Sequence, residues 1–443
     1  MAIPGSLRRI GAIARLTLQA AFRSRLVTAL AVLLAAATFG LPLLVGGDGT
    51  PEGDLRVAVR YAFGTGMGLL VLATLWASCG AVSLETSSKR LALTCVKPVR
   101  SLELWFGKWL GILALDLLLL AGAGIATRAA IAWKIASHPA DAPAPRLITR
   151  ARHAPLLPSL RDEAGQLLAE HPPPPDIDPA TALEVVMAQL PERYQAIPAR
   201  ETVRWSFALD RPLPENETLW LRMQFATDSL SRQEVSAACR LLGDNGGESL
   251  FRVDDFTSSD FTLPVDAAPL AGASAVVLEF TYAPETPDAG ALLIQPRRGL
   301  ALLEPVGPFA PNLVRALLVE ASILAALAAL GVTFGMLFAF PVAAFCATGL
   351  LLSTLVSAYA MSEVIDPEEP PKTAMARLSQ STAVALTSIT EPLLAPSPIE
   401  HLAEGERVPA AEIGASIGWN LLAAPLVLAA LGAALFSRKE SLS

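Results

Sequence analysis

Residues 105–126 read WFGKWLGILALDLLLLAGAGIA, and this stretch decides the class of the protein. A helix needs roughly 17 to 25 predominantly apolar residues to cross a bilayer, so the stretch is long enough for one membrane span. Further stretches of similar length and composition lie at residues 26–45, 62–84, 313–334, 338–360 and 414–436. The sequence therefore predicts a polytopic α-helical membrane protein with six transmembrane helices.

The overall composition agrees with this prediction. The chain has 443 residues, of which 53% are hydrophobic and 17% are charged, whereas an average soluble domain has about 25% charged residues. This composition excludes an ordinary soluble domain and a disordered chain.

The distribution of basic residues predicts the orientation of the spans, because short cytoplasmic segments carry an excess of Lys and Arg. The N-terminal segment, the connection at residues 85–108 and the C-terminal tail are all basic, whereas residues 135–310 and 361–413 are acidic and the first of these contains no lysine. We expect both termini to be cytoplasmic and both acidic segments to lie outside. A bacterial inner membrane is the expected location.

The chain divides into three parts by these patterns. Residues 1–133 hold an interfacial helix and the first three spans, residues 134–310 form an extracytoplasmic domain, and residues 311–443 hold the last three spans with an outer loop at 361–413.

The extracytoplasmic segment predicts an inserted β-sandwich domain. Apolar residues recur with a period of two from about residue 201, as in Val203, Trp205, Phe207 and Leu209, and about eight short runs of this kind are separated by turn signals. Such a series is typical of two packed sheets. Before the strands, residues 146–170 and 180–190 are predicted to form two short helices.

Familiar catalytic and cofactor motifs do not occur in a suitable setting. Residues 414–418 (GASIG) match the G-x-S-x-G pattern of a nucleophile elbow, but they open a membrane span instead of following a strand. Gly107-Lys108 lacks the remaining residues of a phosphate-binding loop. The four histidines and the single outer cysteine, Cys239, show no metal-ligand spacing. We expect no catalytic, cofactor-binding or metal site on this chain, which is not predicted to be an enzyme.

Two acidic residues lie within the predicted spans, at Asp116 and Glu320. A charge at mid-depth in the bilayer costs roughly 2.5 to 3.5 kcal/mol. Each acid is therefore a candidate for a translocation path or for helix packing.

Three segments of the chain resemble the membrane (permease) subunit of the ABC transporter type-2 exporter family. Residues 13–25 (IARLTLQAAFRSR) are similar to that family's interfacial helix, with apolar and basic faces suited to a membrane surface. Residues 85–108 (ETSSKRLALTCVKPVRSLELWFGK) are similar to its inner loop, with an acid, leucine-like residues, Pro-Val-x-Arg and Gly-Lys. Residues 405–440 resemble its closing stretch. The sequence departs from the family pattern at Ser87-Ser88 and at Gln19.

The resemblance implies a function in transport. It implies a permease subunit of an ATP-driven exporter, acting as a homodimer or with a paralogous permease, while ATP and Mg bind to a separate ATP-binding subunit. The family's inner loop contacts that subunit. Carried onto this sequence, the coupling residues are Glu85, Lys89, Arg90, Lys97, Arg100 and Lys108.

Other functions remain open from the sequence. One is a membrane-anchored sensor or scaffold that binds a ligand or envelope partner through its outer β-sandwich. Another is an intramembrane hydrolase built around Ser416, and the basic loop residues have the alternative role of setting topology. The acidic outer domain without lysine argues against nucleic acid as a partner.

Overall fold

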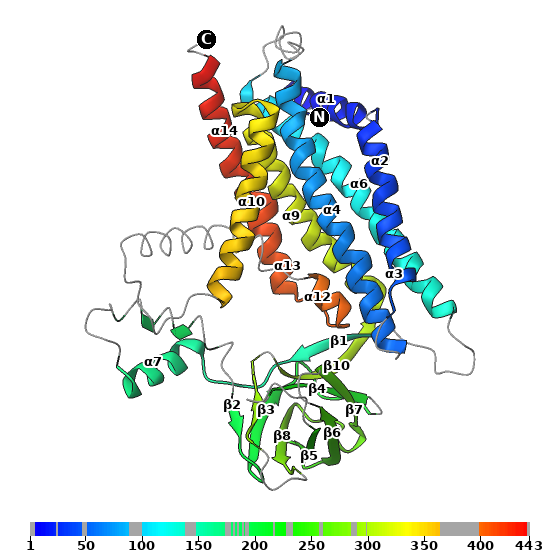
Figure 1. The fold of residues 1–443 in the computed structure, drawn as a ribbon, viewed down its shortest axis with the longest axis vertical. Coiled ribbons are helices and arrows are strands. Elements are labelled where there is room, and N and C mark those ends of the chain that lie inside the picture. The colour runs from blue at the N-terminus through cyan, green and yellow to red at the C-terminus, as the bar shows by residue number, and fades with distance from the viewer. Residues whose placement is uncertain are drawn as a thin grey trace. The chain divides into compact units, whose positions relative to one another are not determined.

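The computed structural model describes residues 5–23, 25–46, 51–87, 100–137, 148–172, 179, 182–183, 186–187, 190, 195–215, 218–226, 234–256, 260–284, 290–297, 299–363 and 398–440 (Figure 1). These residues form two compact units. The helical unit comprises residues 1–147 and 308–443, and the β unit comprises residues 148–307.

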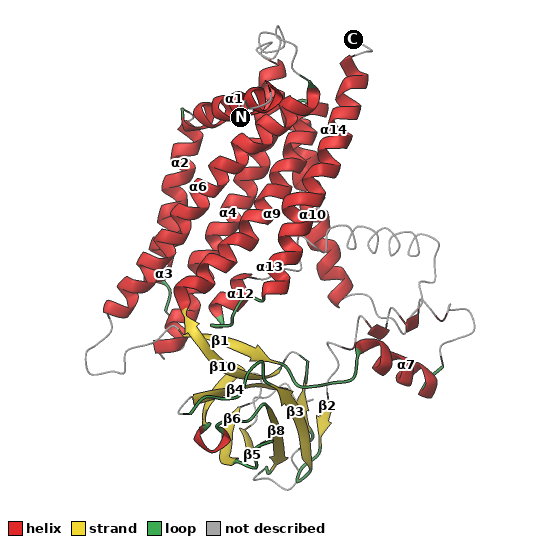
Figure 2. Cartoon of the chain, turned by 180° about the vertical axis from the view of Figure 1, so that it is seen from behind, coloured by secondary structure: helices red, strands yellow, loops and turns green. Residues whose placement is uncertain are grey.

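The helical unit is built from long helices that run side by side (Figures 1 and 2). Its elements are α1 (Gly5–Phe22), α2 (Arg25–Ala35), the π-helix η1 (Ala36–Gly40), α3 (Leu41–Leu44), α4 (Pro51–Ser87), α6 (Ser101–Ala136), α9 (Phe309–Leu337), α10 (Phe340–Glu363), α12 (Pro398–Ala403), α13 (Ala410–Ser416), the π-helix η4 (Ile417–Ala423) and α14 (Ala424–Glu440). Helix α1 differs from the others because it lies across one end of the bundle, which we call the α1 end.

Among the residues that the structure describes, five helical segments are long and apolar enough to cross a membrane by length and composition. They are Val27–Leu44, Gly53–Glu85, Ser101–Ala136, Phe309–Leu337 and Ala410–Phe436. The prediction of a membrane protein is thereby confirmed in its general form. The predicted span at residues 338–360 coincides with α10, whose described apolar part, Phe340–Thr354, is shorter.

Helices α4 and α9 approach each other closely where α9 carries two glycines four residues apart. A Cβ atom on Gly331 would lie 2.9 Å from the carbonyl oxygen of Leu75, and one on Gly335 would overlap the carbonyl oxygen of Cys79. Small residues at this spacing allow helix backbones to pack directly inside a membrane. Any larger side chain at these positions would force the two helices apart.

The indole groups of two tryptophans connect α6 to α9. Trp109 donates from Nε1 to the carbonyl oxygen of Ala325 at 2.8 Å, and Trp105 donates from Nε1 to Thr333 Oγ1 at 3.0 Å. Both indole nitrogens are therefore satisfied inside an apolar bundle, where an unpaired donor would be costly.

Helix α1 is held against α6 by a second pair of glycines. A Cβ atom on Gly107 would lie 2.6 Å from the Cβ of Ile13, and one on Gly111 would lie 2.6 Å from the Cβ of Thr17. Ile13 and Thr17 are the residues of α1 that this contact buries. The contact fixes α1 against the second and third turns of α6.

The described residues of the β unit form two sheets. Its elements are β1 (Ile148–His153), α7 (Leu160–Glu170), β2 (Gln195–Ile197), β3 (Thr202–Ala208), β4 (Thr218–Ala226), β5 (Glu234–Gly243), β6 (Glu248–Phe256), β7 (Asp260–Asp266), the 3₁₀ turn η3 (Ala268–Leu270), β8 (Ala275–Tyr282), β9 (Leu292–Ile294) and β10 (Leu300–Pro308). One sheet has the order β1-β10-β4-β9-β2, with β7 also paired to β4, and the other has the order β3-β8-β5-β6.

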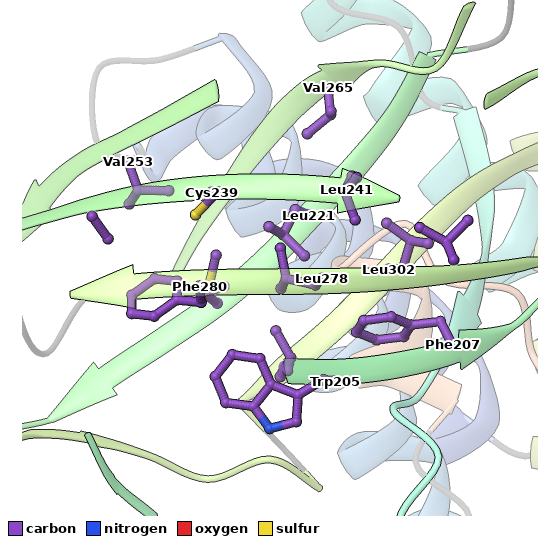
Figure 3. Packing of buried hydrophobic residues seen from close by; sticks show 14 of the residues in the cluster. Trp205, Phe207, Leu221, Cys239, Leu241, Val253, Val265, Leu278, Phe280 and Leu302 are labelled. Atoms are coloured by element: carbon purple, nitrogen blue, oxygen red, sulfur yellow. The ribbon is translucent and has the colours of Figure 1, made fainter. Parts of the chain in front are cut away.

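Side chains from both sheets form one hydrophobic core (Figure 3). Phe225 of β4 and Phe280 of β8 belong to different sheets, and their ring centroids are 5.5 Å apart. Buried and partly buried residues alternate along β8, as the period of two in the sequence predicts. Burial in this core raises the pKa of Cys239 to about 12, so its thiol is a packing group.

The segment before these strands differs from the prediction. Residues 146–170 are predicted to be helical, but residues 148–153 form β1 and only Leu160–Glu170 form a helix. Strand β1 pairs with β10, which lies about 150 residues further along the chain, so this pairing is invisible to local periodicity. The second predicted helix, at residues 180–190, falls mostly outside the described residues.

Candidate functional site

The structure brings together the first and last of the predicted coupling residues. Lys108 Nζ on α6 lies 2.6 Å from Glu85 Oε1 near the end of α4. The Lys108 side chain is 5% exposed and that of Glu85 is 35% exposed. This ion pair joins the two helices that flank residues 88–99.

The remaining predicted coupling residues are divided between described and undescribed parts of the chain. Arg100 is exposed and immediately precedes α6. Lys89, Arg90 and Lys97 lie outside the described residues.

A second ion pair at the α1 end was not predicted from the sequence. Arg9 of α1 donates to Glu103 through two nitrogens, at 2.9 Å from Nε and 2.6 Å from Nη2. Glu103 also accepts a hydrogen bond from the backbone nitrogen of Arg100 at 3.2 Å. An acid in the first turn of a helix caps free backbone N–H groups, so Glu103 stabilises the start of α6 while it holds α1.

The first three turns of α6 therefore make three separate contacts. Glu103 binds Arg9, Lys108 binds Glu85, and the glycine pair Gly107 and Gly111 contacts α1. The Lys108–Glu85 ion pair thereby holds the last turns of α4 against the start of α6.

The two intramembrane acids lie away from the α1 end. Asp116 is 3% exposed and accepts a hydrogen bond from Thr74 Oγ1 at 2.9 Å, while its Oδ2 atom has no hydrogen-bond partner among the described residues. Glu320 on α9 is 5% exposed. Arg315, on the same helix, donates to the carbonyl oxygen of Val408 at 3.5 Å.

The surroundings of Ser416 differ from those of a nucleophile elbow. Ser416 is buried, its Oγ lies 2.5 Å from Ser322 Oγ, and it accepts a hydrogen bond from Asn420 Nδ2 at 3.1 Å. It ends α13 and is followed by the π-helix η4, whereas a nucleophile elbow requires a strand before the serine. The cluster is a polar contact between two helices.

A histidine that the sequence did not single out lies between two carboxylates. His401 Nδ1 is 3.3 Å from Glu406 Oε2, and His401 Nε2 is 3.2 Å from Glu412 Oε2. Asn312 of α9 holds the same turn, because it donates to the carbonyl oxygen of Glu406 at 2.7 Å and accepts from the backbone nitrogen of Val408 at 2.9 Å. This cluster joins α12 to α13.

The carboxylates control the charge of His401. Burial alone would lower its pKa, but the hydrogen bond with Glu406 and the negative charge of Glu412 outweigh burial, so the pKa of His401 is raised above its usual value of 6.5. In the part of the chain that the structure describes, no group of three or more His, Cys, Asp or Glu residues is arranged to hold a metal ion.

The comparisons with known proteins identify no relative. No protein-family model matches the chain, and no curated protein or solved structure matches it.

The Glu85–Lys108 pair predicts an asymmetric response to mutation. Glu85→Gln leaves a buried ammonium group without its carboxylate and is expected to cost about 1 to 3 kcal/mol of folding free energy. Lys108→Met removes the buried charge, so Glu85→Gln should cost much less in that background. Thermal unfolding of the four proteins in one detergent measures this coupling, with exposed Arg100→Gln as the control. If Glu85→Gln lowers the folding free energy equally in both backgrounds, the ion pair between Glu85 and Lys108 is contradicted.

The raised pKa of His401 predicts how stability depends on pH. Protonated His401 is stabilised in the folded state, so its contribution is complete below pH 6.5 and is lost as the pH rises through the folded-state pKa. The melting temperature of the wild type should therefore fall across this interval. The His401→Gln variant should lack this fall, while the exposed His171→Gln variant should retain it. If the melting temperature of His401→Gln depends on pH as that of the wild type does, the prediction is contradicted.

Proposed function

We propose that this chain is the permease subunit of an ATP-driven exporter of the ABC type-2 family. In this proposal α10 is the remaining membrane span, giving six, and the two sheets form an extracytoplasmic β-sandwich. The subunit lies in a bacterial inner membrane with both termini in the cytoplasm, and it acts as a dimer.

The observation that carries the proposal is the Glu85–Lys108 ion pair across residues 88–99. That segment contains Lys89, Arg90 and Lys97 and no acid, which suits a docking surface for an acidic partner. Both of its ends continue directly into membrane-spanning helices. Movement of a docked partner would therefore act on α4 and α6 together.

The family resemblance implies the division of labour between this chain and its partner. The chain contributes the helices and the coupling loop, while ATP and Mg bind to the separate ATP-binding subunit, where hydrolysis takes place. Asp116 and Glu320 are buried acids on helices of the bundle and are the candidates for contact with cargo or for helix packing.

Copurification tests the proposal directly. We expect an ATP-hydrolysing subunit to copurify with the tagged wild type from its native membrane in mild detergent, and to be lost from the Lys97→Glu/Arg100→Glu variant. The Arg60→Glu variant is the matched control, because Arg60 is an exposed residue near the opposite end of α4. It should retain the partner. ATPase activity and mass spectrometry of the eluate measure the outcome.

The alternative function gives the opposite result. If no ATP-hydrolysing subunit accompanies folded wild-type protein, the permease proposal fails. A sensor or scaffold that captures its ligand through the outer β unit would then explain the chain better.

A further inference from the structure

The contacts of α1 fix the direction in which each of its sides points. Ile13 and Thr17 face α6. Arg9 reaches Glu103 in the first turn of α6, so its side of α1 faces the nearby end of the bundle. The two contacts together define how α1 is rotated about its axis.

Two of the three large exposed apolar residues of α1 point the other way, whereas the third, Leu16, lies on the side of Arg9. At about 100° per residue, Leu7 and Phe22 lie roughly opposite Arg9 on the helix, and therefore on the side directed along the spans. Their exposed fractions are 55% and 52%. A side of this kind is suited to the hydrocarbon of a bilayer.

Two arginines of α1, Arg8 and Arg15, face away from α6. Arg8 and Arg15 are seven residues apart, so they share one side of the helix and are about 10 Å apart along its axis. That side is roughly opposite the one that Ile13 and Thr17 present to α6. Both arginines are exposed, and no ion pair or hydrogen bond links either of them to another described residue.

The local charge is uniformly positive. The first 47 residues contain no Asp or Glu, and Glu103, the acid that reaches α1, is occupied by Arg9. An external anion is therefore the group that Arg8 and Arg15 are placed to bind.

We propose that Arg8 and Arg15 bind the phosphate groups of anionic lipids in the leaflet at the α1 end. Guanidinium groups bind phosphate oxygens through paired hydrogen bonds, and their spacing here suits two separate headgroups. Lipid is favoured over a protein partner because these arginines point sideways from a transverse helix whose neighbouring side, with Leu7 and Phe22, is apolar. The binding would hold α1 at the membrane surface independently of any ATP-binding subunit.

Lipid competition on the full-length chain tests the proposal. The purified protein in neutral detergent is offered equal amounts of phosphatidylglycerol and phosphatidylcholine, and the bound lipid is counted by native mass spectrometry. We expect preference for phosphatidylglycerol, weakened by added salt and reduced about fivefold for each arginine lost in Arg8→Gln/Arg15→Gln. The Arg8→Lys/Arg15→Lys variant should retain most of the preference.

The control variant removes the same charge elsewhere. The Arg204→Gln/Arg252→Gln variant changes two arginines of the β unit whose side chains are 72% and 63% exposed. This variant should bind lipid like the wild type. Equal binding of the two lipids by the wild type would overturn the proposal, as would an unchanged preference in a folded Arg8→Gln/Arg15→Gln variant. Loss of a second copy or an ATP-hydrolysing subunit from that variant, with lipid preference unchanged, would make the surface a protein interface and would also overturn it.

Discussion

The close contact of α1 with α6 is the constraint on which the organisation of the α1 end depends. A transverse helix of 18 residues gains little from its own hydrogen bonds, so its position has to come from packing. Gly107 and Gly111 let its backbone approach α6, and the Arg9–Glu103 pair fixes its rotation. The direction of every arginine on α1 follows from these two contacts.

The same turns of α6 connect the surface helix to the bundle interior. Lys108 lies beside the glycine pair and binds Glu85, so α1, α4 and α6 meet within a few residues. Further along α6, Trp109 and Asp116 bind α9 and α4 respectively. One helix thus contacts α1, α4 and α9 and carries the buried Asp116.

Much of this fold is predictable because membrane spans and half-buried strands have simple periods. Apolar length predicts α6 and α9, and alternation predicts β3 and β8. Strand β1 was missed because its partner β10 is distant in sequence. Of the site, Glu85 and Lys108 were identified through a resemblance, but their contact was not. The spacing of Gly107 and Gly111 is typical of close helix packing, but the spacing alone does not identify which helix packs against these glycines.

Limited proteolysis tests the docking of α1 most directly. Trypsin cleavage after Arg15, in the middle of α1, requires α1 to leave α6 and unfold locally. Gly111→Val would place side-chain atoms against Thr17 and the carbonyl oxygen of Ala14, which costs about 1 to 3 kcal/mol, so cleavage should accelerate about fivefold or more. Gly122→Val on the same helix meets no atom within 4 Å at its Cβ and should leave the rate unchanged. Equal cleavage rates in the two variants and the wild type would contradict the docking of α1 at the glycine pair.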